Sequence, residues 1–196
     1  VIEQSGHETV TIGALEKYIT DTAWEEGWVK VNTPVNSVDK SVGIIGAGPG
    51  GLAAADRLRQ EGLEVTIYDR YDRAGGLLTY GIPGFKLEKD VVMRRNEQLE
   101  KSGIKFVLNT NVGEDITFDE IREKHDFVIL ATGVYKAREL DIPNGDLNGK
   151  VAALDYLTAS NRLSFGDRVE EFETGTFNAS GKKVVVIGGG DTATVS

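Results

Sequence analysis

One short stretch restricts the possible folds of this chain more than any other feature. Ser41–Ile45 has the composition of a buried strand, Gly46-Ala-Gly-Pro-Gly-Gly51 follows it, and the next residues, Leu52–Ala55, suit the start of a helix. Asp69 lies 23 residues after Gly46. A strand, a G-x-G-x-x-G turn and a helix, with an acidic residue about 20 positions later, are typical of a dinucleotide-binding βαβ unit. The pattern therefore predicts an α/β fold.

Each of the three motif glycines in this turn is expected for a separate physical reason. Gly46 permits the tight turn, Gly48 lets the backbone approach a pyrophosphate, and Gly51 lets the helix pack close to the strand. Unpaired amides and the helix dipole stabilise an anion there. Asp69 would accept hydrogen bonds from a ribose diol and repel a 2′-phosphate, which favours FAD or NAD over NADP at this turn. The alternative is a glycine-rich turn without a ligand.

Two later segments extend the same site. Gly75-Gly-Leu-Leu78 follows Asp69 by six residues, and a second close backbone approach there suits a ligand longer than NAD, such as FAD. The run Tyr80–Lys86 is too apolar for a solvated loop, so it lines a flavin pocket or packs. The apolar strand 126–131 leads into Thr132 and Gly133, and such small residues leave room for a ligand at the carboxyl end of a parallel strand.

Apolar and amphipathic segments alternate along the rest of the chain. We predict a Rossmann-like parallel sheet with helices on both faces, preceded by an N-terminal helical segment. Residues 1–40 form that segment and a linker, 41–150 an FAD-binding domain, and 151–196 a connection and the start of an NADPH-binding domain. The predicted strands are 41–45, 64–68, 104–108, 126–131 and 183–187, the last two buried, and the predicted helices are 12–28, 50–60, 88–102, 117–124 and 151–161.

A second glycine turn follows the apolar run Lys183–Ile187. It matches G-x-G-x-x-A, the variant often found where NADP binds, and consists of Gly188, Gly189, Gly190, Asp191, Thr192 and Ala193. The residue that selects between NAD and NADP lies about 20 positions further on. Because the sequence starts at Val1 and stops at Ser196, directly after this turn, we expect it to be part of a longer protein.

Composition excludes several other classes. With 31 acidic and 22 basic residues the net charge is −9, which argues against binding nucleic acid or anionic lipid. No apolar run approaches the ~20 residues of a membrane helix, so we expect a cytoplasmic protein. The absence of cysteine excludes a disulfide reductase in this chain. His7 and His125 are too far apart to suggest a metal site, and we expect both to be exposed.

Taken together, the motifs resemble the small (beta) subunit of bacterial glutamate synthase. The similarity extends from the front stretch Tyr18–Trp28 through the two glycine turns and covers nearly the whole chain. The same arrangement occurs in the flavin part of dihydropyrimidine dehydrogenase and in ferredoxin-linked oxidoreductases. The residues that carry the resemblance are 45–52, 68–70, 75–78, 81–87, 131–133 and 188–193.

The resemblance implies a set of cofactor contacts. In addition to Gly46, which makes the turn, it implies that FAD is contacted by Ala47, Gly48, Pro49, Gly50, Gly51, Asp69, Arg70, Gly76, Leu77, Lys86, Val112, Thr132 and Gly133. It implies that the NADPH site begins at Gly188, Gly189, Gly190, Asp191, Thr192 and Ala193. No acid–base residue is assigned, because hydride transfer to a flavin is the chemistry of the cofactor.

The resemblance also implies an activity. In the family, NADPH reduces FAD, and electrons pass through iron–sulfur clusters to the large (alpha) subunit, where glutamate is made from glutamine and 2-oxoglutarate. The cluster cysteines of the family precede the helix that starts at Ile12, and this chain has none. We expect the chain alone to bind FAD weakly and to lack NADPH-dependent turnover. Two alternatives are another ferredoxin-linked or bifurcating FAD oxidoreductase and a dinucleotide-binding module without turnover.

Overall fold

The structure, a computed structural model, describes residues 11–136, 143 and 148–188 and divides the chain into two units. The first unit ends at Asn32 and contains α1, Ile12–Glu25. This helix starts where the sequence predicts and ends three residues earlier, just before Gly27 with its φ of 66°. No residue of α1 is buried. The division of the chain into three domains stays a prediction.

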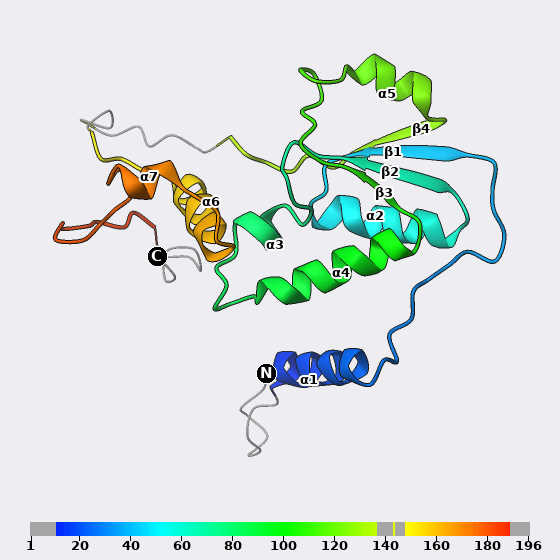
Figure 1. Cartoon of the computed structure of the whole chain (residues 1–196), viewed down its shortest axis with the longest axis horizontal. Helices are drawn as coiled ribbons and strands as arrows, with labels where there is room; N and C mark the ends of the chain where they lie inside the picture. Colours follow the sequence, from blue (N-terminus) through cyan, green and yellow to red (C-terminus); the bar gives the residue numbers. More distant parts are fainter. Residues whose placement is uncertain (1–10, 137–142, 144–147, 189–196) are drawn as a thin grey trace. The chain divides into compact units, whose positions relative to one another are not determined.

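The second unit begins at Thr33 and is built on a parallel sheet (Figure 1). Its four strands follow the order β3-β2-β1-β4. In the central register, Ile44 pairs with Ile67 on one side and with Ile129 on the other. The strands are β1 Ser41–Ile45, β2 Glu64–Tyr68, β3 Lys105–Val107 and β4 Phe127–Leu130, which confirms the predicted α/β sheet.

Helices cover both faces of this sheet, as predicted (Figure 1). α2, Pro49–Gln60, and α4, Lys89–Lys101, lie on one face, and α5, Phe118–Lys124, lies on the other. Successive side chains of a strand point to opposite faces. Ile44 accordingly joins the larger core and its neighbour Ile45 the smaller one. The larger core is made by Val42, Ile44, Ala47, Leu52, Ala55, Val65, Ile67, Ala74, Leu99 and Ile104, and the smaller by Ile45, Tyr68 and Ile121.

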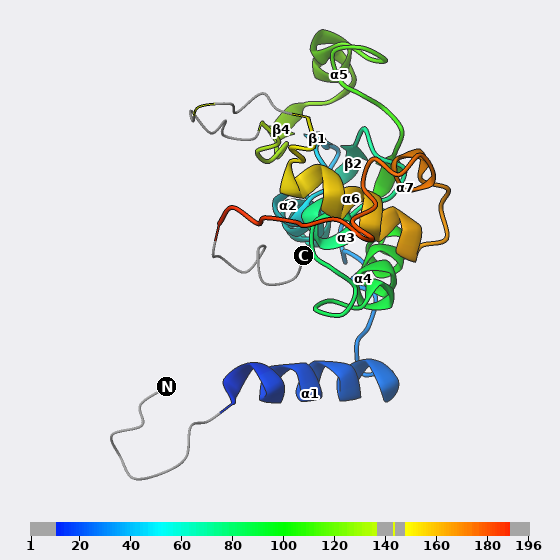
Figure 2. The same ribbon diagram turned by 90° about the vertical axis from the view of Figure 1, so that its left-hand side faces the viewer.

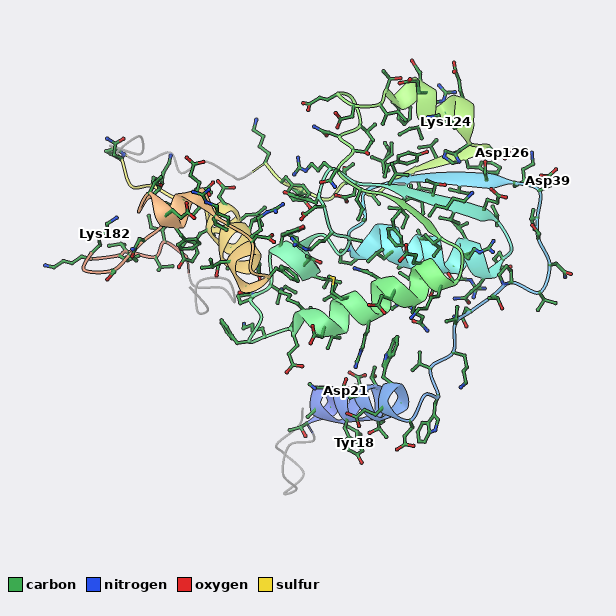
Figure 3. The ribbon with its side chains drawn as sticks, in the orientation of Figure 1. Tyr18, Asp21, Asp39, Lys124, Asp126 and Lys182 are labelled. Atoms are coloured by element: carbon green, nitrogen blue, oxygen red, sulfur yellow. The ribbon has the colours of Figure 1, made fainter. Side chains whose placement is uncertain are left out.

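Two polar devices fix the ends of elements. Thr117 Oγ1 accepts the amide of Glu120 at 3.2 Å, and the Glu120 carboxylate accepts the amide of Thr117 at 2.8 Å, which completes a capping box at the start of α5. Before β4, the carboxylate of Asp126, labelled in Figure 3, accepts the Ser41 amide at 2.9 Å and the Lys40 ammonium at 2.6 Å. These two bonds join the starts of β1 and β4.

Three sequence predictions are wrong. Residues 183–187 form no strand, and Val184–Ile187 are 50–83% exposed, because none of β1–β4 pairs with them. β4 exists, but Phe127 and Leu130 are 57% and 67% exposed because the strand lies at the sheet edge. His125 is partly buried, with Nε2 3.0 Å from Tyr68 Oη, since Gly43 leaves room for its ring.

The loop after β2 is partly helical. α3, Leu77–Tyr80, lies within the glycine-rich stretch 69–87, and α6, Ala153–Ser164, lies against it (Figures 1 and 2). A second short helix, α7, Glu170–Glu173, follows α6. No helix in the described ranges is both long and apolar enough to span a bilayer.

Candidate functional site

The first glycine turn connects the end of β1 to α2. A Cβ on Gly46, whose φ is 110°, would lie 2.3 Å from the Ala131 carbonyl oxygen, and one on Gly51 would lie 1.9 Å from the Gly46 carbonyl oxygen. A Cβ on Gly48 would meet nothing within 4 Å. Backbone contacts therefore require glycine at the two outer positions. The central glycine faces open space, as a turn that receives a ligand requires.

The start of α2 is suited to an anion. Pro49 occupies the first helical position, where its missing amide costs no hydrogen bond. The Leu52 amide makes the first intrahelical bond, to the Gly48 carbonyl at 2.9 Å. The preceding amides of Gly50 and Gly51 have no acceptor within the helix. They and the helix dipole are available to a phosphate.

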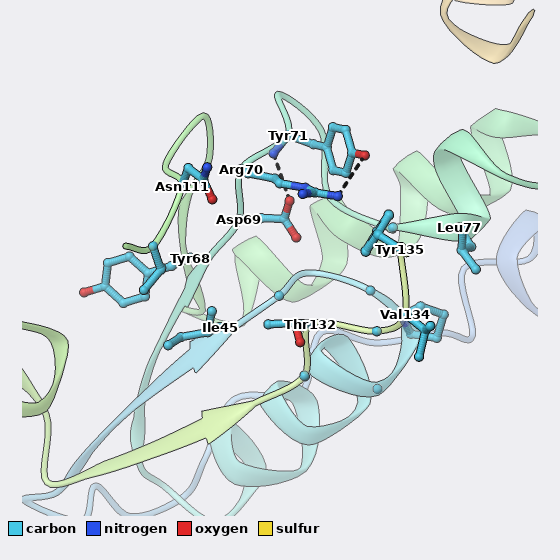
Figure 4. Close-up of a pocket in the computed structure, with 18 of the residues that line it drawn as sticks. Ile45, Tyr68, Asp69, Arg70, Tyr71, Leu77, Asn111, Thr132, Val134 and Tyr135 are labelled. Atoms are coloured by element: carbon cyan, nitrogen blue, oxygen red, sulfur yellow. Dashed lines mark hydrogen bonds between the residues drawn. The ribbon is translucent and has the colours of Figure 1, made fainter. Parts of the chain in front are cut away.

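Asp69 is held beside the turn by two backbone amides, of which Figure 4 shows that of Tyr71. Its Oδ2 accepts the Ala47 amide at 2.6 Å, and its Oδ1 accepts the Tyr71 amide at 2.9 Å. These bonds fix the plane of the carboxylate. Each carboxylate oxygen can accept a second hydrogen bond, so both remain available to a ribose diol.

The second glycine pair packs on the first turn. The Gly75 amide donates to the Ala47 carbonyl at 2.8 Å. Gly76 has a φ of 54°, and a Cβ there would lie 2.8 Å from the Gly48 Cα. Close backbone approach thus requires glycine at position 76, whereas Gly75 has a φ of 122° and a Cβ there would lie 2.1 Å from Thr79 Oγ1. The contact between Gly76 and Gly48 places the first residue of α3, Leu77, at the rim of the same space.

A cavity of about 420 Å³ lies over the carboxyl ends of the strands (Figure 4). This volume is within the ~300–1,000 Å³ of common ligand pockets. Its walls include eleven residues of the predicted site: Gly46, Gly48, Pro49, Gly50, Asp69, Arg70, Gly76, Leu77, Val112, Thr132 and Gly133.

The structure places the other predicted residues elsewhere. Ala47 and Gly51 are buried in the turn behind the cavity wall, and Lys86 is exposed outside it. Gly188 is described, with a φ of 133° that suits a turn. Gly189, Gly190, Asp191, Thr192 and Ala193 lie outside the described residues. The predicted cofactor contacts therefore stay predictions.

Sequence reasoning missed an aromatic wall of this cavity. The guanidinium carbon of Arg70 lies 4.3 Å from the ring centre of Tyr135 and 5.0 Å from that of Tyr71, and burial raises the pKa of Tyr135 (Figure 4). Flat cationic and aromatic groups of this kind favour stacking with a planar base. Ile45, Tyr68, Thr110, Asn111, Ala131 and Val134 complete the lining. The carboxyl ends of parallel strands lie at the same edge of the sheet. The position of Thr110 and Asn111 in the loop after β3 could therefore have identified them as site residues from the sequence.

The residues present fit FAD. The open face at Gly48 suits a pyrophosphate, the fixed Asp69 carboxylate suits a ribose, and the Gly76–Leu77 wall continues beyond both. By contrast, no iron–sulfur cluster fits this chain, which has no cysteine. Nor does the described part of the chain contain a group of three or more acidic or histidine side chains that could hold a metal ion.

Comparison with known proteins agrees with this geometry. The model of the pyridine nucleotide-disulphide oxidoreductase family matches residues 40–195, and the chain belongs to that family. It is 70% identical over 98% of its length to a putative glutamate synthase [NADPH] small chain from Cereibacter sphaeroides, covering 46% of that protein. It is 61% identical to the glutamate synthase [NADPH] small chain of Azospirillum brasilense, again over 98% of its length, covering 40% of that protein. The chain thus spans less than half the length of these relatives.

Solved structures give the same fold. FprA from Mycobacterium tuberculosis, solved in complex with NADPH, aligns with a TM-score of 0.57 and 28% identity. The alignment covers 62% of this chain and 29% of FprA. The predicted likeness to the small chain of glutamate synthase and the Rossmann-like fold are both confirmed.

Proposed function

We propose that this chain is the flavin-binding part of the electron-input subunit of a glutamate synthase. The observation that carries the proposal is the joint packing of Gly48, Asp69 and Gly76 around one cavity. The 70% identity to a putative glutamate synthase [NADPH] small chain supports the choice among flavoproteins. FAD is the cofactor, NADPH the electron donor, and the large (alpha) subunit the partner, in the cytoplasm.

The residues of the cavity bind and orient the cofactor. The amides at the start of α2 hold the pyrophosphate, and Asp69 accepts the hydroxyls of the adenosine ribose. Gly76 and Leu77 line the path toward the flavin, together with Thr132 and Gly133 at the end of β4. When bound, FAD supplies the two-electron chemistry that links NADPH to the one-electron carriers of the assembly.

The second glycine turn supports the assignment of the donor. Gly188 follows the apolar run as the first glycine of a G-x-G-x-x-A sequence and begins the NADPH site. Because this chain has no cysteine, the iron–sulfur clusters of the assembly take their ligands from other sequence. Electrons then reach the large subunit, where glutamate is formed from glutamine and 2-oxoglutarate.

The test uses the full-length protein with and without its large subunit. We expect stoichiometric FAD, reduction of that FAD by NADPH, and glutamate formation from glutamine and 2-oxoglutarate only with the large subunit. In the same assays the 196-residue chain alone should bind FAD weakly and oxidise no NADPH. A full-length protein that carries no flavin would contradict the proposal.

A second candidate is another FAD oxidoreductase subunit. The putative oxidoreductase AegA of Escherichia coli is 46% identical over 95% of this chain, which covers 28% of AegA. NADPH-dependent flavin reduction without any glutamate formation, in the presence of the large subunit, would favour this candidate. A third outcome, nucleotide binding without flavin reduction, would indicate a binding module.

A further inference from the structure

α6 contacts the short helix α3 through a buried amide. Asn161 is 2% exposed, and its Nδ2 donates to the Tyr80 carbonyl at 3.0 Å and to the Leu157 carbonyl at 2.9 Å. Tyr80 ends α3, and the Asn161 bond satisfies its carbonyl from 81 positions further along the chain. Because buried carbonyls need partners, this bond ties the end of α3 to α6.

The Tyr80 side chain joins a charged network. Its ring is buried, at 2% exposed, and its hydroxyl donates to the Asp72 carboxylate. Arg162 of α6 donates to the same carboxylate at 3.0 Å, and its guanidinium lies 5.1 Å from the Tyr80 ring centre. Asp72 therefore receives one donor from α3 and another from α6.

Arg73 and Asp167 complete the network. Arg73 donates to both oxygens of Asp167, at 2.7 and 2.8 Å, and to Asp72 at 2.8 Å. Arg162 also reaches Asp167 at 3.4 Å. The charges of two arginines and two aspartates thus balance one another in a partly buried cluster. Removal of one partner leaves the others uncompensated, which costs more than the loss of an exposed pair.

α3 needs such support because of its length. A helix of four residues makes too few hydrogen bonds to be stable alone. The cap Gly76 packs on Gly48, and the first residue, Leu77, lines the cavity. Any displacement of α3 therefore moves the wall of the cavity.

We propose that Asn161 and Arg162 of α6 are positioning residues for the flavin pocket. They hold Tyr80 and Asp72, and through them the Gly76–Leu77 wall, although neither lines the cavity. The proposal rests on the proposed function only in taking FAD as the ligand. It makes the segment after the sheet a structural part of the flavin site.

The first test needs no ligand. In the full-length protein, Arg162→Met keeps the apolar stem and removes the guanidinium, and Tyr80→Phe removes the bond to Asp72. Arg168→Met is the matched control, since Arg168 is 84% exposed and pairs with Glu173 outside the network. We expect amide hydrogen exchange at Leu78–Gly81 to accelerate by about tenfold or more in the first two variants and not in the control. Unchanged exchange in both variants would overturn the proposal.

The second test measures the flavin. We expect Arg162→Met to weaken FAD binding by about tenfold and to shift the flavin absorption band and midpoint potential, with partial recovery in Arg162→Lys. Circular dichroism confirms that the variants are folded. Faster exchange with unchanged FAD affinity, spectrum and potential would overturn the link to the flavin pocket. If the parent protein binds no FAD, the proposed function is wrong, and so is the link between α6 and a flavin pocket. The hydrogen-exchange result still decides whether α6 holds α3 in place.

Discussion

At the scale of single residues, Asp69 is the group that we propose selects the nucleotide of this site. Its two carboxylate oxygens are fixed by the Ala47 and Tyr71 amides, so a diol meets a preformed acceptor. A charged hydrogen bond contributes about 1.5–3 kcal/mol. Asp69→Ala in the full-length protein should therefore weaken FAD binding by roughly tenfold to a hundredfold in a calorimetric titration. Asp119→Ala, at an exposed position in α5, should leave FAD affinity unchanged; equal affinities for both variants would refute the ribose assignment.

Gly48 and Gly51 give a paired prediction, because they belong to one turn and differ in what a side chain would meet. A Cβ on Gly48 enters open space, so Gly48→Val should fold and lack flavin. A Cβ on Gly51 meets the Gly46 carbonyl at 1.9 Å, so even Gly51→Ala should lower the free energy of unfolding by about 1–3 kcal/mol. Denaturant titration and the flavin absorbance of purified protein distinguish the two effects. Stoichiometric flavin in Gly48→Val would show that this turn is not the phosphate site.

These residues differ in how far the sequence alone could identify them. The turn glycines are predictable because a local backbone conformation requires them. Tyr135 is not, since it meets Arg70 only after β2 and β4 have been brought together by the sheet. The burial of His125 was missed for a similar reason: its place depends on Gly43, 82 residues earlier.

At the scale of elements, the start of β4 is attached to that of β1 through Asp126. Hydrogen bonds from Lys40 and the Ser41 amide lower the pKa of Asp126 to about 2. Because the folded pKa is below the unfolded one, this stabilisation is present above about pH 4 and is lost as the pH falls toward 2. Asp126→Asn should flatten the pH dependence of the free energy of unfolding in that window. The control variant Asp39→Asn, at an exposed position next to Lys40, should leave this pH dependence unchanged. NMR titration of Asp126 near its ordinary pKa would contradict this.

Most element positions follow from apolar periodicity and glycine breaks, and β1, β2 and α5 match the sequence prediction closely. Burial was harder to predict, because it depends on the order of the strands. An apolar run such as Phe127–Leu130 has the same composition at the centre and at the edge of a sheet. α3 escaped prediction because its four residues are stabilised by α6 rather than by their own propensity.

At the scale of the whole molecule, the proposed function assigns to this chain the cofactor-binding part of a longer reaction. Its cavity has the lining that the proposed flavin requires, while its sequence contains no cysteine to hold an iron–sulfur cluster. A protein that passes electrons between cofactors needs each within reach of the next. The relatives, more than twice as long, have room for the remaining parts.

The exposed run Val184–Ile187 has a consequence for the behaviour of the 196-residue chain. Four consecutive β-branched, uncharged residues outside the sheet form a segment prone to intermolecular pairing. Val185 is 83% exposed, so Val185→Lys should slow aggregation severalfold, measured by light scattering at rising concentration. The free energy of unfolding should change by less than about 0.5 kcal/mol, since the side chain packs on little.

Val35→Lys is the matched control for this prediction. Val35 is 97% exposed but stands alone among polar residues and proline, so it offers no run of strand-forming side chains. The same added charge there should change aggregation far less than at Val185. If the two variants slow aggregation equally, net charge rather than the apolar run controls the association. If neither variant slows aggregation, the contacts between chains are made by another surface. The next surface to test is then that of α1, where the apolar side chains of Ile12, Leu15 and Ile19 are exposed.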